Sequence, residues 1–354
     1  MRGGLKPSLS LIKKILIIRI DRIGDLVCTI PSIRALRKNF PDTRITALLS
    51  LYNSDLISDT ELVDDIIVWK NNMPGEEKQY LIKNLKERKF DVVLVFSPYT
   101  EAYKLAYLTG ANIRAGIVLK SRFLTRVFAS FCLNYIFLLD QEGKLRKKEP
   151  LLHEVEKGFA LLEVLGIKEP DREINLLLPE GFITECRQYL NSGMIKDQKG
   201  IIGLPLCSRY IKAGWSVNDL AILAEDLRYR FPEYLLLITS GNQEIKDGEI
   251  LKKRFLDKYG ILVRGPMDVR LWAAFMQNMS LVITIDSGAV HLASSGKVSS
   301  VVLYPPEIYE LCSQEWVPWK VRYKQLIMKD FKDTRDEILE AADELLKGEK
   351  GSVL

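Results

Sequence analysis

Residues 14–25 read KILIIRIDRIGD, an apolar run that ends in a short polar turn. The stretch from Lys14 to Ile20 is rich in isoleucine, and this pattern is typical of a strand that is buried on both faces of a parallel sheet. An amphipathic helix is expected from about Leu26 to Asn39, where Phe40-Pro41-Asp42 ends it. The sequence therefore opens with a strand, a turn and a helix, the first unit of an α/β fold.

The same alternation continues along the chain and restarts once, after an extended bridge at residues 173–180. The length of 354 residues also exceeds what a single core usually supports, which is about 250–300 residues. We therefore predict two Rossmann-like, doubly wound domains that face each other across a cleft, at residues 1–178 and 179–330. Residues 331–354 are expected to form a closing helix, with packing back on the N-terminal domain as one arrangement. The further predicted strands are residues 44–50, 65–69, 91–96, 200–206, 234–239, 261–263, 281–285 and 301–304, and the further helices are 76–89, 218–230, 249–258, 269–278, a helix from about 287, and 334–346.

The composition indicates a globular protein without a strong charge bias. Hydrophobic residues make up 47%, and 51 Lys and Arg against 46 Asp and Glu give a net charge of +5. This excess is too small for a dedicated nucleic-acid-binding protein but suits phosphorylated partners.

Cysteine and histidine are sparse. The five cysteines have no paired spacing, which argues against structural zinc and favours a reducing cytoplasm. With only His153 and His291, no metal site is expected. The N-terminus lacks the features of a signal peptide, and the apolar run at 127–139 is too short to span a bilayer. We expect a cytoplasmic protein.

Ligands of open α/β sheets bind beyond the carboxyl ends of the strands, so the residues that follow each strand are the first candidates. After the first strand come Arg22, Gly24 and Asp25. Gly24 would allow a tight turn, and Asp25 could accept a proton from an attacking hydroxyl. Asp25 could equally cap the helix, and its spacing alone favours the cap. The missing G-x-G-x-x-G pattern disfavours a nicotinamide enzyme.

The segment LVITIDSGAVH at residues 281–291 is a second candidate. The backbone N–H groups of Ser287, Gly288 and Ala289 would open a helix and could bind a diphosphate, and Asp286 could hold sugar hydroxyls. His291 follows one turn into the helix. An ordinary strand–turn–helix with Asp286 as the N-cap explains the same residues about as well.

Residues 206–215 follow the first strand of the second half and form a third candidate. Ser208, Arg209 and Lys212 resemble phosphate ligands, and Lys212 could neutralise a leaving diphosphate. The alternative is a solvated basic loop in which Trp215 packs against the next helix.

Basic residues flank the apolar run at 127–139. Solvated charge is their default explanation, and a surface for anionic lipid or a phosphorylated acceptor is the alternative. The residues concerned are Lys120, Arg122, Arg126, Lys144, Arg146, Lys147 and Lys148.

Taken together, these segments resemble glycosyltransferase family 9, the heptosyltransferases of lipopolysaccharide core assembly. KILIIRIDRIGDLVCTIPSIRALRKNFPDTRITAL is similar to the opening of that family, LVITIDSGAVHLASS to its second signature, and His153-Glu154-Val155-Glu156 to a further segment. The resemblance implies a GT-B fold and inverting transfer from ADP-heptose to a lipid A-linked acceptor. Peripheral contact with the inner face of the cytoplasmic membrane would suit such an acceptor.

The resemblance also implies roles for single residues. Asp25 becomes the general base and Lys212 stabilises the leaving ADP, so that no metal or other cofactor is required. The donor is expected to contact Ser208, Arg209, Glu244 (at the ribose), Met267 (at the adenine), Asp286, Ser287, Gly288, Ala289 and His291. The acceptor side is expected to include Arg22, Gly24, Lys120 and Arg122.

Two features depart from the family pattern. Lys212 and Trp215 are separated by two residues instead of one, and Gly-x-Pro is missing after the helix that carries His291. Another nucleotide sugar, another acceptor, or a non-catalytic nucleotide-sugar-binding protein stay open as alternatives.

Overall fold

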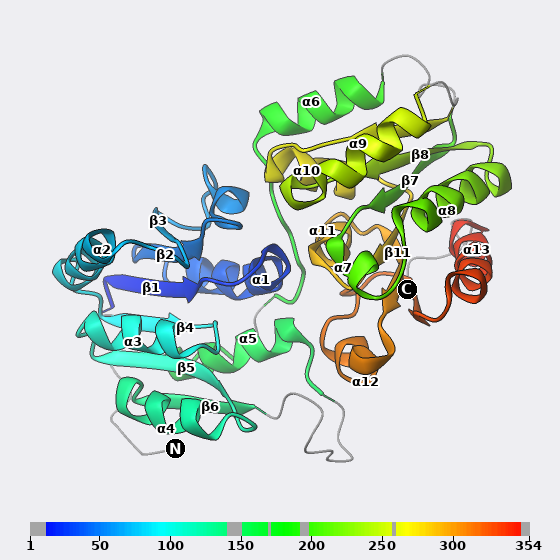
Figure 1. The fold of residues 1–354 in the computed structure, drawn as a ribbon. Coiled ribbons are helices and arrows are strands. Elements are labelled where there is room, and N and C mark those ends of the chain that lie inside the picture. Colours follow the sequence, from blue (N-terminus) through cyan, green and yellow to red (C-terminus); the bar gives the residue numbers. More distant parts are fainter. Residues whose placement is uncertain (1–11, 140–150, 169–170, 192–197, 257–259, 348–354) are drawn as a thin grey trace. The chain divides into compact units, whose positions relative to one another are not determined.

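The computed structural model describes residues 12–139, 151–168, 171–191, 198–256 and 260–347. The chain divides into two compact units, Met1–Asn175 and Leu176–Leu354 (Figure 1). The division falls inside the extended segment that the sequence indicates as a bridge, three residues before the boundary we expected there.

The N-terminal unit is a six-stranded parallel sheet in the order β3-β2-β1-β4-β5-β6. The predicted strands are all present, whereas β5, β6 and the helices α3 to α5 were not predicted. The strands are β1 (Lys14–Arg19), β2 (Arg44–Ser50), β3 (Asp65–Trp69), β4 (Val92–Val95), β5 (Ile113–Leu119) and β6 (Tyr135–Leu139). The helices are α1 (Ile23–Asn39), α2 (Gly75–Glu87), α3 (Thr100–Leu108), α4 (Phe123–Cys132) and α5 (Glu154–Leu162), with short 3-10 turns at Ser54–Ile57 and Glu163–Leu165.

Strand β1 lies in the middle of this sheet and is covered on both faces. Ile15, Leu16, Ile17 and Ile18 are fully buried. Leu16 and Ile18 belong to a core with side chains of α2, α3 and α4, while α1 and α5 pack together on the opposite face (Figure 1). The unbroken apolar run of the sequence is thus explained by a strand with no solvent-facing side.

The C-terminal unit repeats this architecture, with the strand order β12-β11-β10-β7-β8-β9. Its strands are β7 (Gly200–Pro205), β8 (Tyr234–Thr239), β9 (Ile261–Arg264), β10 (Leu281–Ile285), β11 (Ser299–Tyr304) and β12 (Tyr323–Ile327). Its helices are α6 (Glu180–Leu190), α7 (Ser208–Lys212), α8 (Val217–Arg230), α9 (Ile245–Arg254), α10 (Val269–Gln277), α11 (Gly288–Ser295), α12 (Pro306–Glu315) and α13 (Phe331–Lys347), with a 3-10 turn at Asn242–Glu244.

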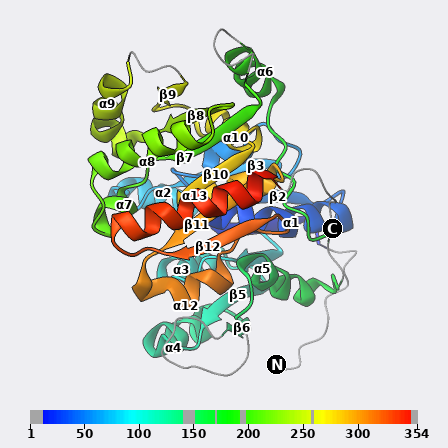
Figure 2. The ribbon, with the colours of Figure 1, turned by 90° about the vertical axis from the view of Figure 1, so that its right-hand side faces the viewer.

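Helix α13 is an integral part of the C-terminal unit. It lies against β10, β11, β12 and α8 (Figure 2), and its apolar stripe of Ile338, Ala342 and Leu345 is buried in the core of that unit. The apolar face of this helix thus belongs to the core of the C-terminal unit, and its packing back on the N-terminal domain stays a prediction.

The apolar run at 127–139 is divided between two elements. Its first part lies in helix α4 and its second part forms the edge strand β6. Among the described residues, no helix is long and apolar enough to cross a membrane.

Candidate active site

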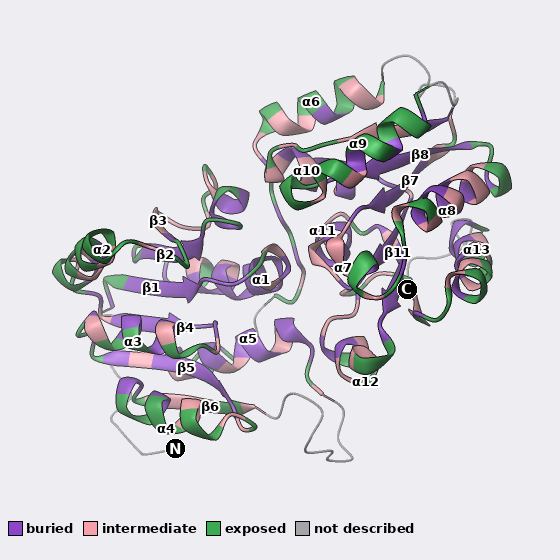
Figure 3. Cartoon of the chain, in the orientation of Figure 1, coloured by how far each residue is buried: buried purple, intermediate pink, exposed green. Residues whose placement is uncertain are grey.

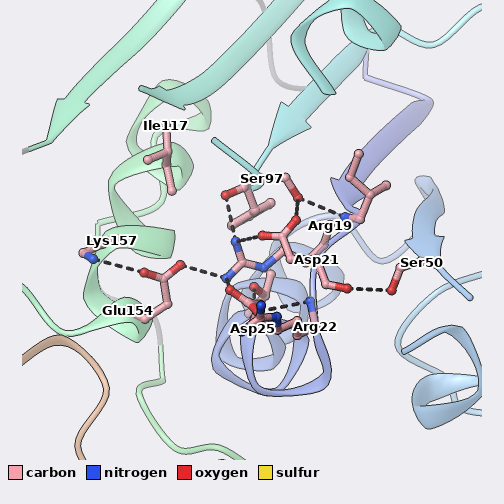
Figure 4. A network of polar contacts seen from close by, with 12 residues as sticks. Arg19, Asp21, Arg22, Asp25, Ser50, Ser97, Ile117, Glu154 and Lys157 are labelled. Atoms are coloured by element: carbon pink, nitrogen blue, oxygen red, sulfur yellow. Dashed lines mark hydrogen bonds and ion pairs between the residues drawn. The ribbon is translucent and has the colours of Figure 1, made fainter. Parts of the chain in front are cut away.

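The carboxyl end of β1 carries a buried arginine that binds three carboxylates. Arg19 is 1% exposed, and its Nη2 lies 2.7 Å from Glu154 Oε1 and 3.5 Å from Asp25 Oδ1. Its Nη1 donates to Asp21 Oδ2 at 3.1 Å and to the carbonyl of Phe96 at 2.8 Å. Lys157 Nζ binds the other oxygen of Glu154 at 3.1 Å (Figure 4). We call these five side chains, Arg19, Asp21, Asp25, Glu154 and Lys157, the Arg19 cluster.

The neighbouring strands hold the turn after β1 in place. Ser97 follows β4, and its hydroxyl binds Asp21 Oδ1 and accepts the N–H of Ile20 at 2.9 Å. Ser50, at the end of β2, donates to the Asp21 carbonyl at 2.6 Å. Because β2, β1 and β4 are adjacent and parallel, their carboxyl ends meet at one edge, and this brings Asp21 into contact with Ser97, 76 positions away.

Exposure separates the three carboxylates. The side chains of Asp21 and Glu154 are 3% and 9% exposed, whereas that of Asp25 is 19% exposed. Asp25 also accepts the backbone N–H of Arg22 at 3.1 Å, as the third residue of α1. Both interpretations of Asp25 are therefore compatible with its geometry: it caps the helix, and it is the carboxylate of the cluster that a ligand can reach.

Electrostatics favour a proton-accepting role at this position. Three carboxylates face two cations, so the Arg19 cluster carries one excess negative charge when all five groups are ionised. Burial raises the pKa of Asp25 above the ordinary aspartate value, against the opposing effect of Arg19. Burial likewise raises the pKa of Asp21 to about 7. Burial would also raise the pKa of Glu154, but the charges of Lys157 and Arg19 hold that pKa below its usual range.

The acceptor-side candidates lie at or near this edge. Arg22 is the N-cap of α1 and is exposed. Gly24 is buried in the first turn of α1, which begins at Ile23. The tight turn expected at Gly24 is therefore wrong, because Gly24 is already helical. Lys120 and Arg122 follow β5, two strands from β1. The basic residues Lys144, Arg146, Lys147 and Lys148 lie outside the described residues.

The C-terminal unit brings its candidates together in the same way. Arg209, in α7 after β7, forms an ion pair with Asp286 Oδ2 at 2.8 Å and donates to the Asp286 carbonyl. The N–H of Ser208 donates to Glu244 Oε1 at 3.0 Å. Since β10, β7 and β8 are adjacent in this sheet, the loops after these strands meet at its centre.

Helix α11 begins at this point. Ser287 is its N-cap with an extended backbone, and its hydroxyl lies 3.1 Å from Thr284 Oγ1. Ser287 and Gly288 are half-buried, whereas Ala289 is buried. The imidazole of His291 is 2% exposed and packs edge-on against Trp316, with 5.7 Å between the ring centroids. Helix α11 thus begins with a partly accessible backbone, and its second turn is packed in the core.

Residues 206–215 are not a loop throughout, because Ser208–Lys212 form helix α7. Lys212 is the last residue of α7 and has an exposed side chain. Gly214 has φ 95°, a conformation that favours glycine, and it turns the chain so that Trp215 is buried and stacks on Tyr210 with 5.7 Å between centroids. The extra residue between Lys212 and Trp215 is accommodated by this turn.

Met267 lies in the turn between β9 and α10 and is half-buried. That turn packs closely on the segment after β8, since a Cβ at Gly265 would lie 2.2 Å from the carbonyl oxygen of Ser240. Gly265 has φ 145°, so only glycine fits there without strain. Met267 is thereby placed in a turn that contacts Ser240, which directly precedes the Glu244 turn.

A model of glycosyltransferase family 9 (heptosyltransferase) matches residues 79–339, which is more than half of the sequence. The chain belongs to this family.

Curated relatives agree with the family 9 assignment. A Haemophilus influenzae protein that carries the provisional name glycosyltransferase is 28% identical over 306 residues, covering 83% of this chain and 82% of its own length. Lipopolysaccharide heptosyltransferase 3 of Escherichia coli is 20% identical over 321 residues, covering 89% of each.

Among solved structures, the ADP-heptose lipopolysaccharide heptosyltransferase II of Escherichia coli is similar in fold. It is 18% identical with a TM-score of 0.73, and the alignment covers 96% of this chain and 100% of that one. The predicted GT-B fold with two Rossmann-like domains is thereby confirmed. The match to the family 9 model confirms the assignment as a glycosyltransferase.

Several residues of this family 9 chain were missed as candidates in the sequence, namely Arg19, Ser97, Glu154 and Lys157. Arg19 ends a strand in which residues 15–18 are buried and apolar, and Ser97 directly follows a predicted strand. The rule that ligands bind at strand ends could have indicated Ser97. Glu154 lies in a segment that resembles the family, but nothing in the sequence pairs it with Arg19. Within the described parts of the chain, no group of three or more His, Cys, Asp or Glu side chains is arranged to hold a metal ion.

Proposed function

We propose that this glycosyltransferase transfers a heptose from ADP-heptose to a lipopolysaccharide core acceptor, with inversion and with Asp25 as the general base. The names of the Escherichia coli relatives support the donor and the acceptor class. The observation that carries the role of Asp25 is its position in the Arg19 cluster: of three clustered carboxylates, it alone is substantially accessible.

The proposed reaction is a single displacement. Asp25 takes the proton of an acceptor hydroxyl as the oxygen attacks the anomeric carbon of the donor sugar. The bond from that carbon to the β-phosphate oxygen breaks, and ADP leaves with the electron pair. The excess negative charge of the Arg19 cluster and the raised pKa of Asp25 favour uptake of that proton.

The C-terminal unit would hold the donor. The backbone N–H groups of Ser287, Gly288 and Ala289 at the start of α11 suit the diphosphate, with His291 one turn further. Asp286 would bind sugar hydroxyls, while Ser208, Arg209 and Lys212 would stabilise the charge that develops on the departing ADP. Glu244 and Met267 are proposed to contact the ribose and the adenine. This proposal requires no cofactor besides the ADP-sugar.

The acceptor is proposed to be a lipid-linked, phosphorylated saccharide. Arg22, Lys120 and Arg122 follow strands at the edge that carries Asp25, and their charges suit phosphate groups. An acceptor of this kind is anchored in a bilayer, so the protein would work at the inner face of the cytoplasmic membrane.

Calorimetric titration of the protein with ADP, ADP-heptose, UDP and NAD tests this function. Binding of ADP and ADP-heptose, weakened by Asp286→Ala, is the expected result. Preference for UDP would keep glycosyl transfer but rule out ADP-heptose as the donor. Binding of none of the four would favour a non-catalytic protein over the proposed enzyme.

A further inference from the structure

Helix α4 exposes an unusual number of large apolar side chains. Leu124 is 81% exposed, Phe131 75%, Phe123 64%, Val127 42% and Phe128 36%. These five residues are spaced one and three apart, so they form a single stripe along the helix. We call this stripe the α4 apolar face. Figure 3 shows α4 with exposed residues along its length.

The orientation of the stripe is the reverse of what an ordinary surface helix shows. Residues such as Ala129 and Cys132 face the core, while four of the largest apolar side chains of α4 face outward. Scattered exposed apolar residues are normal, but a contiguous patch of this kind marks a surface that binds something. Tyr80 is the one large hydrophobic side chain of α2 that is exposed, so α2 carries no such stripe.

The segment of sequence that carries the α4 apolar face has only positive charges. No Asp or Glu occurs from residue 102 to residue 139, whereas Lys104, Arg114, Lys120, Arg122 and Arg126 do. The guanidinium of Arg126 lies 5.6 Å from the centroid of the Phe123 ring, so cation and apolar surface are adjacent. The two units also differ: Met1–Asn175 contains 28 Lys and Arg against 22 Asp and Glu, and Leu176–Leu354 contains 23 against 24.

The face begins at the edge of the sheet that carries Asp25. Helix α4 follows β5, and its N-cap, Arg122, lies close enough to Tyr99 and Tyr103 to lower their pKa values against the stronger raising effect of burial. Asp21 also acts on both tyrosines. Arg122, at the start of α4, and Asp21 of the Arg19 cluster therefore act on the same two tyrosines.

We propose that the α4 apolar face docks into the surface of a bilayer that contains anionic lipid. The apolar stripe enters the boundary between headgroups and acyl chains, and Lys120, Arg122 and Arg126 bind the lipid phosphates. A helix of ten residues is suited to lie in the interface and is too short to cross it. The proposal deepens the proposed function and rests on it, since it assigns the surface by which the enzyme would reach a lipid-linked acceptor.

Charge favours a bilayer over a second copy of the chain. In a symmetric dimer through this face, the same basic residues would meet each other across the interface. Like charges brought together in this way oppose association, whereas anionic headgroups complement them.

Flotation of the full-length protein with lipid vesicles tests the proposal. Vesicles of phosphatidylcholine with phosphatidylglycerol are compared with vesicles of phosphatidylcholine alone, using wild type, the double variant Leu124→Gln/Phe131→Gln, and Tyr80→Gln as a control that is 72% exposed in the same unit. We expect wild type and Tyr80→Gln to float with the anionic vesicles. The double variant should bind at least about tenfold more weakly, because it lacks two apolar side chains that would be buried in the bilayer.

Equal flotation of the double variant and wild type would overturn the proposal, as would failure of wild type to bind anionic vesicles. A wild-type dimer in light scattering that becomes monomeric in the double variant, without vesicle binding, would assign the face to a second copy instead. Transfer to an acceptor freed of its lipid separates the two proposals. The double variant should keep that activity, whereas absence of transfer in wild type would contradict the proposed function and leave the docking result standing.

Discussion

The two sheets present different chemistry at the same topological position. In the N-terminal unit, the edge carries the Arg19 cluster, in which Arg19 is 1% exposed and forms ion pairs with Asp21, Asp25 and Glu154. In the C-terminal unit, the corresponding edge carries the ion pair of Arg209 and Asp286, at 31% and 11% side-chain exposure, beside the start of α11.

The difference indicates a division of tasks between two copies of one architecture. A buried cluster fixes the position and proton affinity of a carboxylate before any ligand arrives. A helix start with half-buried backbone is instead suited to receive an anion, because its first N–H groups have no partner within the helix. We infer that the first edge is built for proton transfer and the second for binding.

The largest effect should come from Asp25→Asn. Asparagine still accepts the N–H of Arg22 and caps α1, but it cannot take up a proton. Turnover should fall by about 10²–10⁴-fold, the usual contribution of a general base, while ADP binding by calorimetry stays within about twofold of wild type. Near-normal turnover would show that Asp25 only caps the helix.

Arg19→Met should destabilise the N-terminal unit. Removing the guanidinium leaves Asp21, Asp25 and Glu154 with Lys157 as their counter-ion, and breaking a buried pair costs about 3–5 kcal/mol. The free energy of unfolding, measured by denaturant titration, should fall by about that amount. The loss should be smaller at acidic pH, because the unpaired carboxylates can then be protonated.

The matched control for that variant is Arg44→Met. Arg44 pairs with Asp65 in the same unit, but their side chains are 59% and 25% exposed. Its loss should cost about 1 kcal/mol or less. Equal destabilisation by the two variants would contradict the interpretation that Arg19 stabilises a buried cluster of three carboxylates.

Asp286→Ala tests the binding edge. Charge-assisted hydrogen bonds to sugar hydroxyls contribute about 1.5–3 kcal/mol, so the affinity for ADP-heptose should fall by about 10- to 100-fold. Asp219→Ala, which removes the carboxylate of the capping box at the start of α8 in the same unit, should leave affinity unchanged. Unchanged donor affinity in Asp286→Ala would move the sugar contact to another residue.

The smallest effect should come from Lys212→Gln. Lys212 is exposed at the end of α7, whereas Arg209 reaches Asp286. A solvated charge contributes about 1 kcal/mol or less, so turnover should fall by no more than about fivefold. Arg209→Gln should reduce donor affinity more than Lys212→Gln does, and the reverse order would make Lys212 the main phosphate ligand.

The sequence predicts the inner strands β1, β2, β4, β7, β8, β10 and β11 and the edge strands β3 and β9, but it misses β5, β6 and β12 on one side of each sheet. Strands such as Lys14–Arg19 are continuous apolar runs with clear boundaries. The run at 127–139 is different, because helix α4 and strand β6 are both apolar there and only the two-residue link at Leu133 and Asn134 separates them. Periodicity does not distinguish two short elements that share one composition.

The two edges also differ in how far their residues could be predicted from the sequence. The proposed anion-binding part of the second edge is local in sequence, since Asp286 to His291 occupy one strand–turn–helix, and these residues could be predicted as a group. The ion pair of that edge is not local, because Arg209 and Asp286 are 77 positions apart. The Arg19 cluster joins Arg19 to Glu154 across 135 positions. Only the fold brings these side chains together, so Asp25 could be predicted as a candidate while the groups that set its pKa could not.

The pH dependence of turnover at saturating ADP-heptose tests the role of Asp25 most directly. A base must be ionised, so turnover should fall as the pH drops through the pKa of Asp25, and burial places that fall above the pH at which an ordinary aspartate titrates. The apparent value belongs to the whole cluster, since Asp21 titrates with it. We predict that the residual turnover of Asp25→Asn lacks this acidic fall. An acidic fall that persists unchanged in Asp25→Asn would show that another group is the base.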